Sequence, residues 1–352
     1  MLNIYDVKIA FFSAKSYDIE YFSLINKKFN FNIKFFSNRL DIDTVSLAKG
    51  YNVICIFVND VVNKEIADIL FNNGVQLIAL RCSGYNNIDL SATYKKIHVV
   101  RVPSYSPYAV AEHAVALMLS LNRKIHKAYY RTRDGNFNLE GLLGFDMFNK
   151  TAGIIGTGKI GKVVIKILNG FGMKILAYDK NPDEEYKKIY NFEYVDLDTL
   201  YKKSDIISLH CPLNEETFHI INKNSISKMK DGVMLINTGR GHLIDTKALI
   251  EGLKTGKIAY AGLDVYEEET DYFFKDFSNS FIQDDILARL LTFNNVIITS
   301  HQGFFTKEAL YNIADTTLNN IKDYFEGNRL LNEICYKCDE NFCIKEKTGK
   351  CW

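Results

Sequence analysis

Thr151-Ala-Gly-Ile-Ile-Gly-Thr-Gly-Lys-Ile-Gly161 is the stretch of sequence that decides the fold. The glycine spacing within it is weak evidence alone, but a strand before it and a helix after it are the context that phosphate binding requires. Gly156 would form the tight turn, Gly158 would let a diphosphate approach the backbone, and Gly161 would let the helix pack closely on the strand. The free N–H groups at the positive end of the helix would then bind the diphosphate.

An acidic residue stands where such a motif needs one. The next predicted strand ends at Tyr178 and is followed by Asp179, 18 residues after Gly161 and close to the expected spacing of about 20. Its carboxylate can accept hydrogen bonds from ribose hydroxyls and would repel a 2′-phosphate, so NAD is favoured over NADP. The alternative is a glycine-rich turn with a surface Asp, but the order of strand, turn, helix, strand and acid favours the dinucleotide.

Short β-rich runs alternate with helical patterns on both sides of this motif. Strands are expected at 7–12, 33–36, 53–57, 76–80, 98–102, 151–155, 174–178, 205–209, 233–237, 259–265 and 295–299. Helices are expected at 16–27, 63–71, 109–121 and 307–325. This order predicts an α/β fold with doubly wound parallel sheets, in which residues 104–300 form one unit and both chain ends form the other. The pattern alone leaves open which unit the last helix joins.

Composition limits the possible partners and compartments. The 352 residues suffice for two domains, and 43 basic residues nearly balance 42 acidic ones, which gives no support for nucleic-acid or membrane-surface binding. The N-terminus lacks the basic start and long apolar stretch of a signal peptide. No run approaches the roughly 18 apolar residues that span a bilayer. We therefore expect a cytoplasmic protein.

Four of the seven cysteines crowd the last 20 residues. Cys335-Tyr-Lys-Cys338 could be half of a zinc site. However, the intervals to Cys343 and Cys351 are tight, there is no second Cys-x-x-Cys pair, and no His lies near them in the sequence. We therefore expect a polar tail with incidental thiols and no metal.

Three later predicted strands each end in polar residues, at the edge where open α/β sheets bind ligands. They lead to Arg240, to the acid run that closes with Glu269, and to His301. A guanidinium can pair with the carboxylate of an α-keto acid and polarise its keto oxygen. An imidazole can deliver the proton, because histidine has an unperturbed pKa of about 6.5, and a nearby carboxylate favours its protonated form. These three side chains are therefore the candidate catalytic residues.

Longer motifs identify the chain as similar to the D-2-hydroxyacid dehydrogenase family, and within it to the fermentative NAD-dependent D-lactate dehydrogenases. The similarity covers residues 5–330 and rests on these stretches: Arg81-Cys-Ser-Gly-Tyr-Asn-Asn-Ile-Asp89, Val102-Pro-Ser-Tyr-Ser-Pro-Tyr-Ala-Val-Ala-Glu-His113, Leu121-Asn-Arg-Lys-Ile-His-Lys-Ala-Tyr-Tyr-Arg-Thr-Arg133 and His301-Gln-Gly-Phe-Phe-Thr. The resemblance implies a Rossmann NAD-binding domain, residues 104–300, inserted into a flavodoxin-like substrate domain made of 1–103 and 301–352. It also implies a homodimer.

The resemblance carries functional residues over to this chain. It matches Arg240, Glu269 and His301 to the family's catalytic Arg, Glu and His. It implies substrate contacts at Ser83, Gly84, Tyr105 and Arg240, to which we add Phe304, whose bulk together with Tyr105 would crowd a large side chain. The cofactor contacts expected from the motif and the resemblance are Gly156, Gly158, Lys159, Ile160, Gly161, Asp179, Cys211, Pro212, Thr217, Thr238, Gly239 and Asp264.

The expected reaction is the reduction of pyruvate by NADH to D-lactate. Two alternatives stay open: a dehydrogenase for a larger 2-keto acid, and a non-catalytic NAD-sensing adaptor on the same fold. Among the remaining polar residues, we expect Glu267 and Glu268 to be solvated, and His219 has no evident partner. His242 lies close to Arg240 in sequence but ranks far below His301 as a proton donor.

Overall fold

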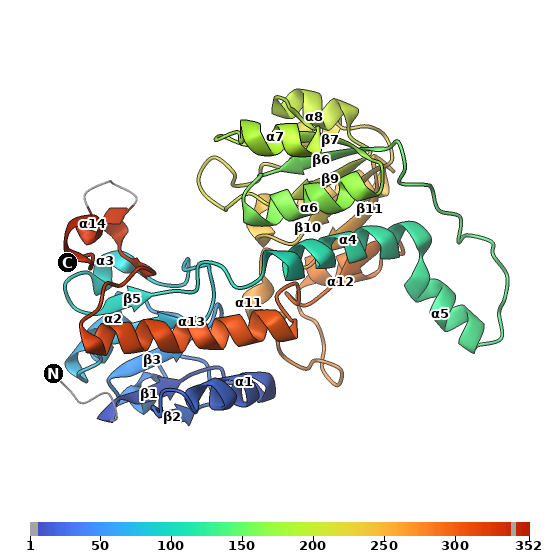
Figure 1. Ribbon diagram of the computed structural model, residues 1–352. Helices are drawn as coiled ribbons and strands as arrows, with labels where there is room; N and C mark the ends of the chain where they lie inside the picture. The colour runs from blue at the N-terminus through green and yellow to red at the C-terminus, as the bar shows by residue number, and fades with distance from the viewer. Residues whose placement is uncertain (1–5, 339–342) are drawn as a thin grey trace. The chain divides into compact units, whose positions relative to one another are not determined.

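A computed structural model describes residues 6–338 and 343–352 and divides the chain into two compact units (Figure 1). Unit 1 comprises residues 1–106 and 305–352, and unit 2 comprises residues 107–304. The sequence placed the two boundaries after residues 103 and 300, so the observed ones lie three and four residues later. The last long helix belongs to unit 1 together with the N-terminal strands.

Unit 1 is built on a six-stranded sheet with the order β2-β1-β3-β4-β5-β13. Its strands are β1 (Lys8–Phe11), β2 (Asn32–Phe35), β3 (Val53–Ile56), β4 (Leu77–Leu80), β5 (His98–Val100) and β13 (Glu333–Ile334). The first five are parallel in the flavodoxin-like order 2-1-3-4-5. Residues of β3 and β4 are buried throughout, as expected of parallel strands covered on both faces. The tail adds the antiparallel strand β13 beside β5, which the sequence did not predict.

Helices cover both faces of this sheet. The helices of unit 1 are α1 (Ser16–Asn26), α2 (Lys64–Asn72), α3 (Leu90–Thr93), α13 (Lys307–Glu326) and α14 (Lys345–Thr348), with short 3-10 turns η2 (Val45–Ala48) and η4 (Tyr336–Cys338). Helix α13 packs on α1 and β4, while α2 and α3 lie together on the other side (Figure 1). Thr306 caps the start of α13 by accepting from the backbone of Ala309, and Gly327 ends the helix with a left-handed φ of 76°.

Unit 2 holds a seven-stranded, wholly parallel sheet with the order β8-β7-β6-β9-β10-β11-β12. Its strands are β6 (Thr151–Ile155), β7 (Lys174–Tyr178), β8 (Glu193–Tyr194), β9 (Ile206–Leu209), β10 (Val233–Asn237), β11 (Ile258–Leu263) and β12 (Val296–Ile298). Numbered along the chain this is 3-2-1-4-5-6-7, which extends the Rossmann order. The predicted α/β class with two doubly wound sheets is confirmed. Strand order reverses between β6 and β9, and this is the switch point where such sheets bind ligands.

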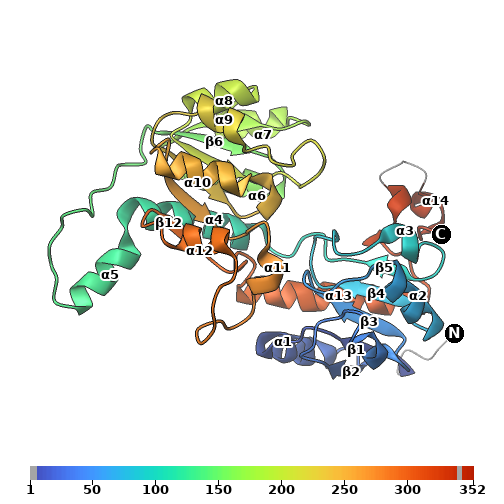
Figure 2. The same cartoon turned by 180° about the vertical axis from the view of Figure 1, so that it is seen from behind.

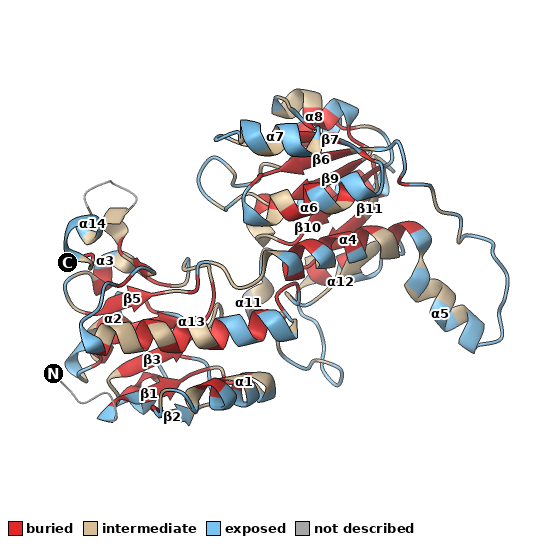
Figure 3. Cartoon of the chain, in the orientation of Figure 1, coloured by how far each residue is buried: buried red, intermediate tan, exposed pale blue. Residues whose placement is uncertain are grey.

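Two hydrophobic cores lie on the two faces of the second sheet, and its strands are mostly buried between them (Figure 3). One face is covered by α4 (Pro107–Arg123) and α6 (Lys159–Gly170), which pack on each other. Helices α8, α9, α10 and α12 cover the opposite face, seen in Figure 2. The further helices of this unit and their bounds are α5 (Ile125–Arg133), α7 (Glu184–Tyr190), α8 (Leu197–Lys203), α9 (Lys223–Lys228), η3 (Gly241–Leu243), α10 (Thr246–Lys254), α11 (Glu269–Tyr272) and α12 (Asp285–Leu291).

The C-terminal tail departs from the expectation of a polar segment with incidental thiols. Cys335 and Cys351 are buried, and the four tail sulfur atoms lie within 4.8 Å of one another. Sequence spacing missed this grouping because Cys351 returns to the sheet edge, where its backbone N–H donates to the side chain of Glu333.

None of the helices formed by residues 6–338 and 343–352 combines the length and apolar character needed to cross a bilayer.

Candidate active site

The glycine turn joins β6 to α6 with little room to spare. A Cβ on Gly161 would lie 2.0 Å from the backbone oxygen of Gly156, and a Cβ on Gly156 would lie 2.5 Å from the backbone nitrogen of Cys211. Gly156 also has a left-handed φ of 96°, which glycine adopts without strain. Both positions therefore require glycine for the fold itself.

Gly158 differs from its two neighbours. No heavy atom of the described residues lies within 4 Å of a Cβ built there, so the space in front of this residue is open. Gly158 is also the N-cap of α6, and among the described side chains none caps this helix end. The first N–H groups of the helix, from Lys159 and Ile160 onward, are therefore left for another acceptor, as an anion site requires.

Asp179 follows β7 and is tied to the glycine turn. Its Oδ2 accepts from the backbone N–H of Thr157 at 2.6 Å and from the hydroxyl of Thr157 at 3.1 Å. Its Oδ1 accepts from the backbone N–H of Asn181 at 2.9 Å. The carboxylate is only partly buried, and Oδ1 has a second lone pair for a further donor. The acid therefore lies at the edge of the turn, where a ribose hydroxyl could reach it.

The loop after β9 forms the opposite side of the switch point. Burial lowers the pKa of His210 to about 4, so its imidazole is neutral and hydrogen-bonds Ser208 at 2.8 Å. Burial raises the pKa of the Cys211 thiol to about 11, so it stays protonated. Thr217 closes the following loop by donating to the carbonyl of Pro212 at 2.6 Å. These residues form a wall that is uncharged at neutral pH beside the glycine turn.

One buried hydroxyl in this region is left unsatisfied by the protein. Thr238 directly follows β10 and is 7% exposed, and its Oγ1 has no hydrogen-bond partner among the described residues. Buried polar atoms are nearly always hydrogen-bonded, so such an orphan indicates a missing partner. Together with the open space at Gly158, it shows that these residues fit a bound dinucleotide.

The carboxyl ends of all seven parallel strands meet at one edge of the sheet. Read along that edge, Asp179 follows β7, Gly156 follows β6, His210 follows β9, Thr238 follows β10 and Asp264 follows β11. His301 comes soon after β12, at the end of this row. The candidate cofactor and catalytic residues therefore occupy one continuous edge.

Backbone hydrogen bonds join the ends of β10, β11 and β12. The N–H of Asp264 donates to the carbonyl of Asn237 at 2.9 Å, and the N–H of His301 donates to the carbonyl of Asp264 at 2.8 Å. Three loops that are far apart in sequence are thereby fixed side by side.

Asp264 holds the turn that carries His301. Its side chain is 1% exposed and accepts from the Thr299 hydroxyl at 2.5 Å and from the backbone N–H groups of Gln302 and Gly303 at 2.8 Å each. Burial would raise the pKa of this carboxyl, but hydrogen bonds from His113 and Thr299 outweigh it and hold the pKa below its usual value. Contact between Asp264 and the cofactor stays an expectation from the resemblance.

His301 and Glu269 form a close pair. Nδ1 of His301 lies 2.9 Å from Oε1 of Glu269, and both side chains are about one-sixth exposed. A carboxylate can only accept, so Nδ1 carries the proton of this bond and Nε2 is left for another partner. Oε2 of Glu269 accepts from the backbone N–H of Tyr266 at 3.1 Å, which orients the acid in turn. His301 has a φ of 49°, a left-handed conformation that the Asp264 contacts stabilise.

Arg240 is presented by a tightly held loop. The Asn237 side chain donates to the carbonyl of Arg240 at 2.8 Å and accepts from the N–H of Gly239 at 3.0 Å. A Cβ on Gly241 would lie 2.2 Å from the carbonyl oxygen of Tyr266, so this loop lies directly against the loop that leads to Glu269. The guanidinium itself is partly exposed and donates to the carbonyl of Gly239 at 2.8 Å.

The remaining substrate candidates are divided between the units. Ser83, Gly84 and Tyr105 belong to unit 1, whereas Phe304 is the last residue of unit 2 and is buried. Ser83 and Gly84 follow β4 and are partly exposed, and Arg101 donates to the carbonyl of Ser83 at 2.7 Å. The carbonyl of Tyr105 accepts from the Asn312 side chain at 2.7 Å.

The predictions that Glu267 is solvated and that His219 has no partner were both wrong. Glu267 is not a solvated member of the acid run, because its Oε1 lies 2.7 Å from Nε2 of His219 and 3.2 Å from Nδ1 of His242. Burial would raise its pKa, but hydrogen bonds from Thr246 and the two histidines hold it below the usual value. Sequence reasoning also missed His113 as a partner of Asp264, since 151 residues separate them and only the fold brings them to 3.2 Å.

Comparisons with known proteins agree with this architecture. Residues 115–303 match the family model described as D-isomer specific 2-hydroxyacid dehydrogenase, NAD binding domain. The D-lactate dehydrogenase of Escherichia coli strain K12 is 50% identical over 329 residues, which cover 93% of this chain and 100% of that relative. The chain belongs to the D-isomer specific 2-hydroxyacid dehydrogenases. It is therefore an NAD-dependent D-2-hydroxyacid dehydrogenase.

Solved structures extend the same relation to three dimensions. The apo structure of D-lactate dehydrogenase from Escherichia coli aligns with this dehydrogenase at a TM-score of 0.85 and 47% identity, covering 93% of this chain and 100% of that one. The structure of D-lactate dehydrogenase with NAD+ from Lactobacillus jensenii aligns at a TM-score of 0.78 and 35% identity, covering 93% and 99%. NAD as the cofactor, which the glycine motif predicted, agrees with both the family model and this relative.

Proposed function

We propose that this dehydrogenase reduces pyruvate to D-lactate. The observation that carries the proposal is the His301–Glu269 pair, in which Nδ1 of the imidazole is 2.9 Å from the carboxylate at the same sheet edge as the glycine turn. Such a pair presents Nε2 of the imidazole to a substrate in a fixed orientation. The similarity to relatives named D-lactate dehydrogenase supports pyruvate as the keto acid.

Each residue has a distinct part in the proposed reaction. Bound NADH supplies the hydride that reduces the keto carbon. The Arg240 guanidinium pairs with the substrate carboxylate and polarises the keto oxygen. Protonated His301 donates its Nε2 proton to that oxygen, which becomes the hydroxyl of the product. Glu269 fixes the imidazole ring through its contact with Nδ1, while Asp264 holds the turn on which His301 stands.

Further donors to the substrate carboxylate are proposed from the family resemblance alone. Backbone N–H groups at Ser83 and Gly84 would bind it, and Arg101 stabilises this loop through the Ser83 carbonyl. Tyr105 and Phe304 are proposed to limit the size of the substrate side chain. A small 2-keto acid is therefore favoured over a branched one.

A spectrophotometric panel tests the proposal directly. NADH oxidation is measured with pyruvate, 2-ketobutyrate and 2-ketoisocaproate, and the highest kcat/KM is expected for pyruvate. In the reverse direction, D-lactate but not L-lactate should reduce NAD. Faster turnover of 2-ketoisocaproate would favour the alternative of a larger 2-keto acid. Flat traces with every keto acid would instead favour the NAD-sensing adaptor.

We also propose the homodimer expected from the resemblance. Large apolar side chains are exposed on and after α5, among them Ile125, Tyr130, Phe137, Leu139 and Leu143. A second copy of the chain would cover this surface, since exposed apolar patches of this kind mark association sites. Light scattering during size-exclusion chromatography should give twice the chain mass of 40.4 kDa, and a monomer would contradict the proposal. A cytoplasmic location remains a prediction.

A further inference from the structure

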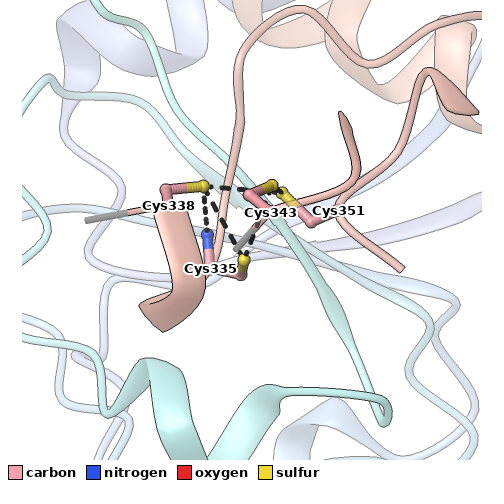
Figure 4. Close-up of side chains that lie close together, drawn as sticks. All are labelled: Cys335, Cys338, Cys343 and Cys351. Carbon is pink, nitrogen blue, oxygen red and sulfur yellow. Dashed lines mark hydrogen bonds between the residues drawn. The ribbon is translucent and has the colours of Figure 1, made fainter. Parts of the chain in front are cut away.

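Four cysteines of the C-terminal tail point their sulfur atoms at a common centre (Figure 4). Cys335 directly follows β13, Cys338 ends η4, Cys343 precedes α14, and Cys351 follows it. The Sγ–Sγ distances are 3.7 Å for 335–338, 4.0 Å for 335–343, 3.7 Å for 338–351 and 3.4 Å for 343–351. Seven cysteines in the chain are free, so none of these contacts is a disulfide.

These distances are those of a tetrahedral tetrathiolate site. Zinc binds thiolate sulfur at about 2.3 Å, and a regular tetrahedron with that radius has edges of about 3.8 Å. Four of the six Sγ–Sγ separations, at 3.4 to 4.0 Å, bracket this value, and all six lie within 4.8 Å. A disulfide would need about 2.05 Å. The sulfur atoms are also too close together to surround a cluster of several iron ions. The space between them has room for a single ion.

Hydrogen bonds and a ring contact from neighbouring groups hold cysteines of the cluster in position. The backbone N–H of Cys335 donates to the Sγ of Cys338 at 3.4 Å, a bond that stabilises thiolate charge. The backbone N–H of Cys351 donates to Oε2 of buried Glu333 at 2.6 Å, and Oε1 of Glu333 contacts Nδ1 of His98. The Trp352 ring stacks on His98 with centroids 3.9 Å apart. The ligand positions are thereby fixed by residues outside the cluster.

Among the described residues, regular secondary structure contributes little to holding the tail against the sheet. Strand β13 contributes only two residues of pairing to β5, and α14 has four residues, none of them buried. Lys345 donates to the backbone carbonyls of Leu331 and Glu333 at 3.3 and 2.8 Å. A short segment with so small an apolar core usually needs a metal or cross-link for stability.

We propose that Cys335, Cys338, Cys343 and Cys351 bind one zinc ion as a structural site that fastens the C-terminal tail to strand β5. Soft thiolate ligands in tetrahedral S4 geometry select zinc or a single iron, and zinc suits a site with no redox task. Binding is redox-neutral: four thiols lose four protons to solvent and form four sulfur–zinc bonds. The site lies outside the catalytic residues, so its test does not depend on the proposed substrate.

Metal content of the full-length protein gives the first test. The protein is purified under reducing conditions without a chelator, and metals are measured by mass spectrometry of the digested sample. We expect about one zinc per chain. Replacement of zinc by cobalt should produce the intense visible bands of tetrahedral cobalt with sulfur ligands. A metal-free protein with four reactive tail thiols, a mass deficit of two hydrogens per disulfide, or iron in place of zinc would overturn the proposal.

Single-ligand variants provide the second test. Cys351→Ser and Cys338→Ser should each weaken zinc binding by about ten-fold or more in competition with a chelator, since they remove one of four ligands. Cys55→Ala is the matched control, because Cys55 is a buried thiol in β3, outside the cluster. Chelation should lower the Tm of the unaltered protein and of the control by more than it lowers that of Cys351→Ser. Equal zinc affinity in Cys351→Ser, Cys338→Ser and the control would contradict the assignment, whatever their stability.

Discussion

Gly161 and Gly158, only three residues apart, separate the folding requirement of the glycine turn from its ligand-binding requirement. In Gly161→Ala the new Cβ would lie 2.0 Å from the backbone oxygen of Gly156, whereas ordinary contact begins at 3.4 Å. Backbone must therefore move by about 1.4 Å, and overpacking of this kind costs about 1–3 kcal/mol. We expect the free enzyme to lose that much stability and to bind NADH poorly.

Gly158→Ala is expected to behave differently. The new Cβ meets no described heavy atom within 4 Å, and the φ of −67° suits alanine. The unfolding free energy of the free enzyme should change by less than about 1 kcal/mol, since a Gly→Ala change at a compatible backbone is mild. The methyl group would however occupy the space through which a diphosphate reaches the helix N-terminus. We expect the Kd for NADH to rise about ten-fold or more, a cost of about 1.4 kcal/mol.

Urea unfolding of the free enzymes and fluorescence titration with NADH measure the two effects separately. Gly170→Ala is the matched control, because it lies in the same helix, is exposed, and has no described heavy atom within 4 Å of a new Cβ. It should leave NADH affinity unchanged. The reasoning is refuted if Gly158→Ala destabilises the free enzyme as much as Gly161→Ala, or if it binds NADH as tightly as the control.

Three other substitutions address the proposed catalytic edge. Glu269→Gln should lower kcat about 10²-fold with NADH affinity unchanged, because a positioned acid supplies about 10²–10⁴-fold in all; an unaltered kcat would remove Glu269 from the mechanism. Arg240→Lys should lower kcat/KM for pyruvate about 10-fold or more, the worth of a charged hydrogen bond, while a change confined to NADH binding would contradict its role. Asp264→Asn should cost about 1–3 kcal/mol at neutral pH. Because the pKa of Asp264 is lowered in the fold, its contribution is present above the ordinary value of about 3.9 and is lost as pH falls below it, so urea unfolding should show the two proteins converging in acid.

Local patterns predicted most of the fold because the strands are strongly apolar and evenly interrupted. The predicted bounds of β6, β7 and β10 agree with the structure, and α13 begins at the predicted Lys307. Strand β13 was missed because two residues carry no periodicity, and its pairing with β5 depends on a return of the chain from α13. Short edge strands of this kind are fixed by tertiary contact.

The site could be predicted wherever a motif defines its own backbone, as in the glycine turn and the loop around Arg240. It could not be predicted where partners meet only after folding. Glu267 pairs with His219, which is 48 residues away, and no local pattern indicates that contact. The four tail cysteines were set aside for the same reason: their sequence spacing matches no common zinc motif, whereas their sulfur atoms converge in space.

The most direct test of the account is the turnover of His301→Ala with pyruvate at saturating NADH, measured beside its NADH affinity. If His301 donates the proton, kcat falls by about 10²–10⁴-fold while the Kd for NADH stays within about two-fold of the unaltered enzyme. Turnover that survives the substitution would contradict the account, because the group that protonates the keto oxygen would then be another one.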